Sequence, residues 1–342
     1  MFEARILSDS ISQTGKRLTT FEATFPRIVL AEFNTHRAFS RNSASSRAIP
    51  FLKQLSWVIS DPFIPARFPK NTKGMQPAEY YELGTFEYEL ASKVWLNARD
   101  SAIEHAKRLT GDLPAALIPS GSDLVSDTEV FLNVHKQIAN RLIEPFLFHK
   151  VIVTASEWSN FFKLRTHSDA QDEIRTIADL LYDLYYREDA PCPEGLKGCE
   201  VYHGTYTPQI LDKDQWHLPL LYTEDKILIE RMYNDGELAS VHSNPSLAVL
   251  EFFKQVSVAR CARVSYLTHE GKRDILKDLE LYTRLHTSGH WSPFEHVACP
   301  AFYVKDGYYV NEQHGNFVGW KQHRKEFPNE NAINFRKEVS FY

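Results

Sequence analysis

A dense group of hydrogen-bond donors occupies the short stretch from Arg37 to Arg47. Three arginines and four serines lie within it, directly after Thr35 and His36. The arginine guanidinium is a planar fork of donors that matches phosphate or carboxylate, and serine hydroxyls add neutral donors without bulk. This combination favours an anion pocket for a phosphorylated small molecule. On composition alone, a solvated polar loop is the alternative.

The sequence does not indicate metal or thiolate chemistry. Of the four cysteines, Cys192, Cys199, Cys261 and Cys299, only the first two are close, and their gap is not the usual spacing of zinc ligands. We therefore expect free thiols in packing roles and no metal site. The sequence also lacks a Gly-x-Gly-x-x-Gly fingerprint, so we expect no Rossmann dinucleotide site.

The donor-rich stretch resembles the signature of the FAD-dependent thymidylate synthases, which is Arg-His-Arg, seven residues and Ser. The positions that agree in register are His36, Arg37, Ser40, Asn42, Ser45 and Arg47. Three positions depart from the longer family pattern, where Arg, Glu and Tyr are replaced by Thr35, Ser43 and Ala48.

Two further blocks resemble the same family. One contains Arg141-x-x-x-Pro145 and the run from Asn160 to Arg165. The other contains Ser265 and Gly289-His290-x-Ser292-Pro293-Phe294-Glu295-His296, and it leads to a degenerate second signature with Gln322, Arg324 and Glu330. In the family this last block precedes the signature, whereas here it follows. Because Phe21-Glu22 before His36-Arg37 is echoed by Phe294-Glu295 before His323-Arg324, we expect a duplicated or rearranged member with an internal repeat.

The resemblance implies a role for each matching residue. The deoxyuridine nucleotide dUMP would be held by Ser45, Arg47, Arg141 and Arg165, of which Ser45 and Arg165 would be catalytic. FAD would be lined by His36, Arg37, Asn160, Ser265, His290 and Glu295. Gln322 and Glu330 would supply groups that the first signature lacks, so that one site is assembled from both halves of the chain or across subunits.

The resemblance also implies the reaction. Carbon 5 of uracil is a poor nucleophile, and many enzymes activate it by adding a cysteine thiolate to the ring. The family uses reduced FAD instead, with methylenetetrahydrofolate as carbon donor and NADPH as reductant. The protein would orient the three molecules and place positive charge at the pyrimidine carbonyls.

Composition restricts the partners. The net charge of −5 gives no general attraction to nucleic acid or to anionic membranes, and no apolar run is long enough to span a bilayer. The first residues lack the pattern of a signal peptide, so we expect a cytoplasmic protein. The family resemblance implies a homodimer that imitates a tetramer, or a homotetramer.

The predicted fold class is α/β, with a central mixed or antiparallel sheet flanked by long helices. A hairpin is predicted over 5–25 and a strand over 151–154. A helix is predicted to open at Pro26, and further helices are predicted near 90–110, 128–142, 174–184, 224–234, 245–258 and 274–288. The helix at 128–142 is expected to have Ile138 and Leu142 on its apolar face. The predicted division is a first half at 1–190, a linker or insert at 191–220 and a second half at 221–342.

Three other functions remain open from the sequence. A relative with the same fold would hydroxymethylate dUMP or dCMP, since Thr35, Ser43 and Asp169 alter the expected pocket. A second alternative is a non-catalytic protein that binds nucleotide or flavin. The third is a nucleic-acid-binding protein, against which the acidic net charge argues.

Overall fold

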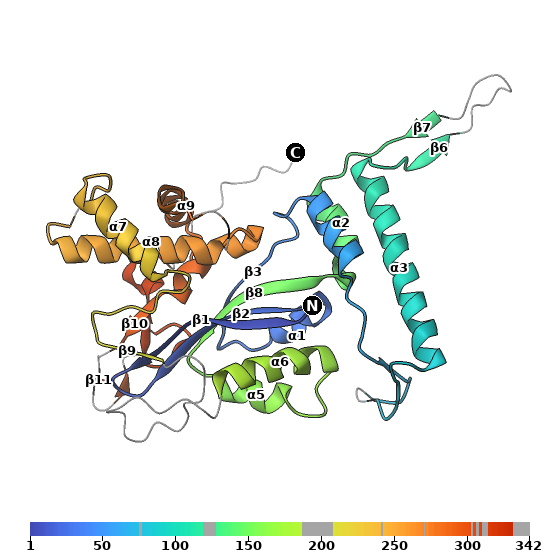
Figure 1. Ribbon diagram of the computed structural model, residues 1–342, viewed down its shortest axis with the longest axis horizontal. Helices are drawn as coiled ribbons and strands as arrows, with labels where there is room; N and C mark the ends of the chain where they lie inside the picture. Colours follow the sequence, from blue (N-terminus) through green and yellow to red (C-terminus); the bar gives the residue numbers. More distant parts are fainter. Residues whose placement is uncertain are drawn as a thin grey trace, which may run out of the picture.

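A hairpin of two long strands forms the middle of the main sheet (Figure 1). The computed structural model describes residues 1–74, 77–118, 128–186, 208–240, 242–269, 271, 273–301, 304–305, 308–309 and 314–330. In the hairpin, β1 (Glu3–Ser12) and β2 (Arg17–Pro26) pair antiparallel. Gly15 in the connecting turn has a φ of +80°, which glycine adopts at little cost. The predicted hairpin is therefore confirmed.

The main sheet has the strand order β3-β8-β2-β1-β9. β8 (Phe148–Ala155) pairs antiparallel with β2 and also with the edge strand β3 (Ser40–Ser43). At the other edge, β9 (Gln209–Leu211) runs parallel to β1. The sheet is therefore mixed, as predicted. β3 was not predicted, because its polar sequence reads as a loop.

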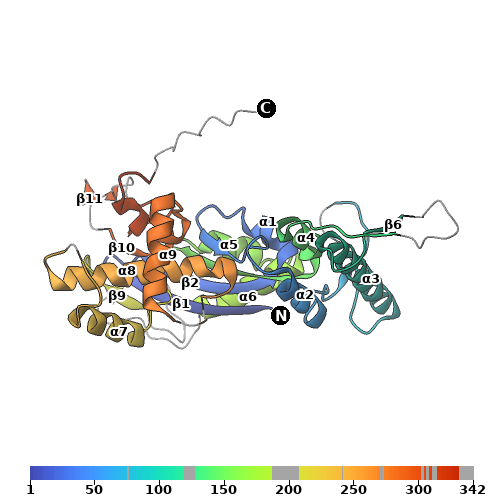
Figure 2. The same cartoon turned by 90° about the horizontal axis from the view of Figure 1, so that it is seen from above.

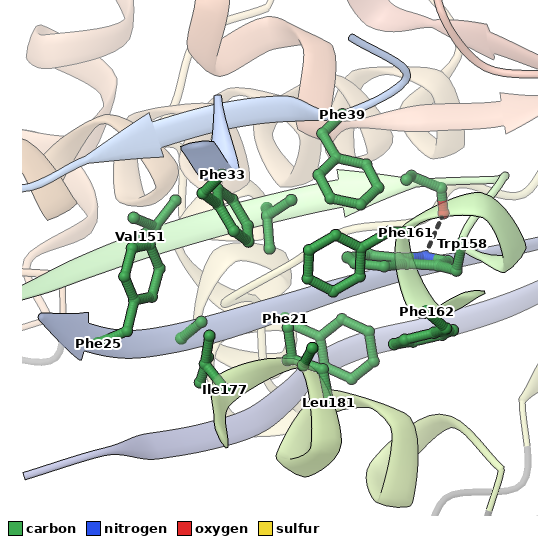
Figure 3. Packing of buried hydrophobic residues seen from close by; sticks show 14 of the residues in the cluster. Phe21, Phe25, Phe33, Phe39, Val151, Trp158, Phe161, Phe162, Ile177 and Leu181 are labelled. Atoms are coloured by element: carbon green, nitrogen blue, oxygen red, sulfur yellow. Dashed lines mark hydrogen bonds between the residues drawn. The ribbon is translucent and has the colours of Figure 1, made fainter. Parts of the chain in front are cut away.

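One face of the sheet carries the largest apolar core (Figure 3). Alternation in β2 places Phe21, Ala23 and Phe25 on this face, where side chains of α5 (Ser159–Arg165) and α6 (Asp172–Tyr185) cover them. Before α5, the Trp158 ring packs edge-on against Phe21 with a centroid separation of 4.9 Å. Because α5 is anchored this way, the position of Arg165 at its last residue is set by the core.

The opposite face of the sheet is covered by helices from the second half of the chain (Figure 1). Val264 and Cys261 pack against Ile152 of β8. The helices are α7 (Thr223–Asn234), α8 (Pro245–Arg263), the 3-10 turn η3 (Val264–Tyr266) and α9 (Ile275–Ser288). The predicted helices in this region are confirmed, and α8 extends to Arg263. Chain segments distant in sequence thus meet across one sheet.

A long helix, α3 (Phe86–Thr110), stands out from the sheet with the β6–β7 hairpin in both views (Figures 1 and 2). It ends at Gly111 with a φ of +86°. The helix predicted from residue 128 is wrong at its start: β7 (Thr128–Val130) occupies those residues, and α4 (Lys136–Ile143) begins later. The expected apolar face of that helix is also wrong, since Ile138 and Leu142 are exposed.

The remaining elements are short, apart from α2 (Phe51–Ser60), which was not predicted. Two single-turn helices, η1 (Arg27–Val29) and α1 (Leu30–Phe33), lead from β2 towards His36, as Pro26 predicted. The others are β4 (Phe68–Pro69), β5 (Tyr80–Tyr81), β6 (Ala116–Ile118), η2 (Glu144–Phe146), η4 (Ser292–His296), β10 (Ala298–Pro300), β11 (Val304–Lys305), β12 (Tyr308–Tyr309), β13 (Trp320–Gln322) and η6 (His323–Glu326). Among the helices of the described ranges, none combines the length and the apolar character that a membrane span requires.

The expected internal repeat is not borne out. Phe21 and Glu22 lie in the middle of a long strand, whereas Phe294 and Glu295 lie in the 3-10 turn η4. The two sequence echoes therefore adopt different local structures. The predicted domain division stays a prediction, because residues 187–207, which include most of the linker, lie outside the described residues.

A buried carboxylate on β2 ties three strands to the second half of the chain. Glu22 accepts hydrogen bonds from Arg5 at 3.1 Å, from Lys150 at 2.8 Å and from the His269 ring. Burial by itself would raise the pKa of Glu22, but the hydrogen bonds from His269 and Lys150 outweigh it and lower the pKa from 4.5 to about 2. This interaction is therefore fully present above pH ~4.5 and is lost as the pH falls through about 2.

We expect Glu22→Gln to lower the free energy of unfolding at neutral pH. The difference from wild type should then shrink by about 3 kcal/mol as the pH falls from about 4.5 to about 2. Denaturant unfolding at stepped pH measures it. Glu79→Gln, which removes an exposed partner of Lys70, is the control and should show no such pH dependence. An unchanged difference between Glu22→Gln and wild type across this range would contradict the prediction.

Candidate active site

The His36 ring lies between two phenylalanine rings and an arginine. Its centroid lies 4.9 Å from that of Phe161 and 5.7 Å from that of Phe39. Arg165 donates from Nε to His36 Nε2 at 2.9 Å, and from one terminal nitrogen to Glu32. Because arginine only donates, Nε2 of His36 accepts and the ring proton belongs on Nδ1. Burial, followed by the nearby Arg165 and Arg41 charges, lowers the pKa of His36 to about 4, so the ring is neutral at physiological pH.

This ring borders a hollow of about 270 Å³ between the end of α1 and α5. The structure brings together here four residues that the sequence singled out: His36, Arg37, Asn160 and Arg165. Arg37 and Asn160 are exposed. Within the part of the chain that the structure describes, neither side chain has a hydrogen-bond partner. Their donors are thus available to a ligand.

A second and larger hollow, of about 860 Å³, lies on the other side of the signature segment. Ser45 and Arg47 line it together with Ser265 and His290. The backbone N–H of Ser45 donates to the Ser265 carbonyl at 2.9 Å, which fixes the signature segment against the end of α8. The chain then reverses at Leu267, whose φ is +54°, and returns as α9.

Several residues that line this larger hollow were not predicted as site residues, among them Arg284 and Gln137. Arg284 projects from α9 and Gln137 from α4. Arg284 and Arg47 have no carboxylate partner among the described residues, in contrast to Arg263, which is bonded to Asp278 at 2.6 Å. The spacing of Arg284, Ser288 and Leu281 on one helix face is a signal in the sequence, but only the fold shows which face meets Ser45.

Glu295 belongs to a polar cluster at the start of β3. It accepts from Ser40 Oγ at 2.7 Å and from Arg324 at 2.5 Å. Gln322 Nε2 lies 3.3 Å from the same Ser40 oxygen, and Glu330 accepts from Arg324 at 2.7 Å. The structure therefore brings the second-signature residues onto the first signature. Ala332 of that second signature lies outside the described residues.

A chain of buried hydrogen bonds fixes β3 and η4 relative to each other. His296 bonds to Asn42 Oδ1 and Thr154 at 2.8 Å each, and Thr154 continues to Thr20 at 2.7 Å. Thr20 in turn bonds to His217 at 2.7 Å. Burial lowers the pKa of both histidines to about 3, with a further contribution of His296 at His217, so both rings are neutral. This neutral network holds Asn42 and the turn that carries Glu295.

Arg141 is the exception among the predicted site residues. It is exposed on α4, pairs with Glu144 at 2.9 Å and lines neither hollow. Within one chain the four predicted nucleotide ligands are thus separated: Ser45 and Arg47 line the larger hollow, and Arg165 lines the smaller. The flavin candidates are divided as well, with Ser265 and His290 in the larger hollow and Glu295 in the polar cluster. These role assignments stay predictions.

The cysteines that the structure describes are free and buried. Burial raises the pKa of Cys261 and, with Glu326 nearby, brings that of Cys299 to about 12. Cys192 and Cys199 lie outside the described residues. Within the described ranges, no three His, Cys, Asp or Glu side chains are grouped so that they could hold a metal ion.

Solved structures that are similar to this chain include two complexes of one protein. They are the UMP/dUMP methylase PolB from Streptomyces cacaoi bound with 5-Br UMP and the same methylase bound with 5-Br dUMP. The sequence identities are 15% and 14%, and the TM-scores are 0.38 and 0.37, respectively. Each alignment covers 53% of this chain, and the alignments cover 87% and 88% of the methylase chain. Among curated proteins, no sequence matches.

A family model described as thymidylate synthase complementing protein matches residues 17–192. The match spans more than half of the chain, in one continuous stretch that includes the signature, Arg141 and Arg165. It gives no support to a duplicated member, since it does not extend to the second half. On this match, and in agreement with the signature, the chain belongs to the thymidylate synthase complementing protein family.

Proposed function

We propose that the protein is an FAD-dependent thymidylate synthase, which methylates dUMP to dTMP with methylenetetrahydrofolate and NADPH. Family membership supports a thymidylate-synthase-like function in which a pyrimidine nucleotide is methylated. The observation that carries the finer proposal is the pair of donor-lined hollows on either side of the signature segment.

The larger hollow is our proposed nucleotide site. Arg47 and Arg284 contribute positive charge that no described carboxylate neutralises, and Ser45 and Ser265 add neutral donors. Arginine binds phosphate through two parallel hydrogen bonds, so unpaired arginines at the mouth of a polar hollow suit a nucleotide monophosphate.

The smaller hollow is our proposed contact for FAD. The residues present fit that group. The neutral His36 ring packs against Phe161, and the unpartnered donors of Arg37 and Asn160 match flavin carbonyls or phosphates. Reduced flavin would supply the hydride that completes the methyl group. Arg165 is held by Glu32 and His36, and its charge does not titrate. In an assembly that joins the hollows of neighbouring protomers, it would stabilise the polarised carbonyl of a pyrimidine bound by the neighbour.

Assembly would complete these sites. FAD is larger than the smaller hollow, so its full enclosure requires a further wall. α3 and α4 each leave an apolar stripe exposed: Leu90 and Val94 are 53% and 61% accessible, and Ile138 is 54% accessible. Exposed apolar stripes of this kind mark interfaces in soluble proteins. We propose a homodimer or homotetramer in which neighbouring protomers join their hollows and bring Arg141 to a site.

We expect Leu90→Glu with Val94→Glu to dissociate the assembly, because burying two carboxylates in an apolar interface is costly. Light scattering after size exclusion should give at least twice 39.5 kDa for wild type and about 39.5 kDa for the variant. Ile227→Glu on α7 removes an equally exposed apolar side chain and should leave the mass unchanged. A wild-type monomer with full activity would refute the proposal.

Flavin binding tests the proposed function. We expect the purified protein to retain added FAD through gel filtration, and NADPH oxidation to depend on dUMP. Arg37→Ala and Asn160→Ala should lower FAD retention, whereas Arg231→Ala, an exposed arginine of α7, should not. A protein that takes up no FAD would contradict the proposal and favour the non-catalytic relative.

A hydroxymethylase acting on dUMP or dCMP is the second candidate. The observation that favours it is the substitution of the signature Arg and Glu by Thr35 and Ser43. Thr35 lines the smaller hollow and contacts Arg165 at 3.5 Å, so this altered position borders the proposed site. The mass of the product distinguishes the two reactions.

A further inference from the structure

A third cavity lies behind the signature segment. It has a volume of about 250 Å³ and is lined by residues of β2, β8, α2 and the loop after β3. Successive residues of the signature segment border different cavities: Ala44 and Ser46 border the third cavity, whereas Ser45 and Arg47 border the larger hollow. The third cavity is therefore separate from the proposed nucleotide and flavin contacts.

Two polar groups that line this cavity have no hydrogen-bond partner. The side chain of Gln54 on α2 is only 2% exposed, and its Oε1 has no partner. Thr24 Oγ1 on β2 is likewise buried and has no hydrogen-bond partner. A third lining residue, His149, also has an Nε2 without a partner, but His149 is paired with Phe25 across β2 and β8, and the Phe25 side chain lies in the apolar core. The His149 side chain therefore lies on the opposite face of the sheet from Thr24. A buried amide without a partner costs stability, which makes Gln54 informative.

The charges of the lining exclude phosphate as the favoured ligand. Its two cationic side chains are both paired: Arg27 with Glu144 at 3.1 Å and Lys150 with Glu22 at 2.8 Å. The rest of the wall is largely apolar and includes Trp57, Phe148 and Ile49. An apolar wall with a few convergent polar groups is typical of a site for a small organic molecule.

We propose that this cavity is a further ligand site, and that it binds a neutral planar heterocycle through a lactam edge. A primary amide such as that of Gln54 offers one donor and one acceptor side by side, which is the complement of an N–H next to a C=O. The Thr24 hydroxyl serves as a third contact on the same face, and the Trp57 ring provides apolar cover.

Lumazine, a two-ring pteridinedione with such an edge, is the probe. Calorimetric titration is done on the full chain with dUMP and FAD in excess, so that neither proposed site is open to the probe. We expect saturable binding by wild type, weakened about tenfold or more by Gln54→Leu and about three- to tenfold by Thr24→Val. Arg231→Ala, an exposed position on α7 that lines none of these cavities, should leave it unchanged.

Stability provides an independent readout. Gln54→Leu keeps a similar volume and removes a buried amide that lacks a partner, so its melting temperature should equal or exceed that of wild type. Loss of binding in a variant of equal or higher stability supports the site. No saturable binding by wild type, or binding that Gln54→Leu leaves intact, would overturn the proposal. The two polar groups would then be hydrogen-bonded to buried water.

Discussion

Arg47→Ala and Arg284→Ala are each expected to weaken dUMP binding by about ten- to a hundredfold. Each variant removes a charge-assisted contact to phosphate worth about 1.5–3 kcal/mol. Neither arginine has a carboxylate partner among the described residues, so the loss is not offset by freeing an internal ion pair. Equilibrium titration of dUMP measures it.

Arg231→Ala is the matched control for both variants. It removes the same charge from an exposed position on α7 that lines neither hollow. If dUMP affinity is unchanged in Arg47→Ala and Arg284→Ala while both remain folded, the larger hollow is not the nucleotide site. An equal loss of dUMP affinity in Arg231→Ala would show that the effect comes from the overall charge of the protein and not from the larger hollow.

Arg260→Leu is expected to lower the free energy of unfolding by about 3–5 kcal/mol. The guanidinium is 2% exposed, and it bonds to Asp225 at 2.6 and 3.0 Å and to Asp278 at 3.0 Å. These carboxylates belong to α7 and α9, so Arg260 of α8 holds the three helices together. Its removal leaves the buried Asp225 without its closest partner and leaves the buried Asp278 with Arg263 alone.

Thermal and denaturant unfolding measure this loss. Lys70→Ala, which breaks an exposed ion pair with Glu79, should leave stability nearly unchanged. Because α8 and α9 form a wall of the larger hollow, dUMP affinity should fall together with stability in Arg260→Leu. A fully stable Arg260→Leu protein would show that the buried network contributes little to this wall.

The sequence predicted the elements whose apolar pattern is set locally. Phe21, Ala23 and Phe25 alternate, and Ile174, Ile177 and Leu181 recur at helical spacing, so β2 and α6 are found where expected. β3 was missed because Ser40 and Asn42 face a buried polar network and not an apolar core. α4 was misplaced because Ile138 and Leu142 form an exposed stripe, which a pattern cannot distinguish from a buried one.

The candidate site was predictable in composition but not in arrangement. The signature motif identified His36, Arg37, Ser45 and Arg47, yet the sequence could not show that they face two different hollows. That division follows from strand β3, because His36 and Arg37 precede it and Ser45 and Arg47 follow it. Arg284 has no motif of its own, so only the packing of α9 against the signature segment reveals it.

The mass of the product made from dUMP tests the central claim most directly. The protein is incubated with dUMP, FAD, NADPH and methylenetetrahydrofolate, and the nucleotide pool is analysed by mass spectrometry. The account predicts dTMP, with the mass gain of one methyl group, and no product when FAD is omitted from flavin-free protein. A hydroxymethylated nucleotide, or dTMP formed without flavin, would contradict it.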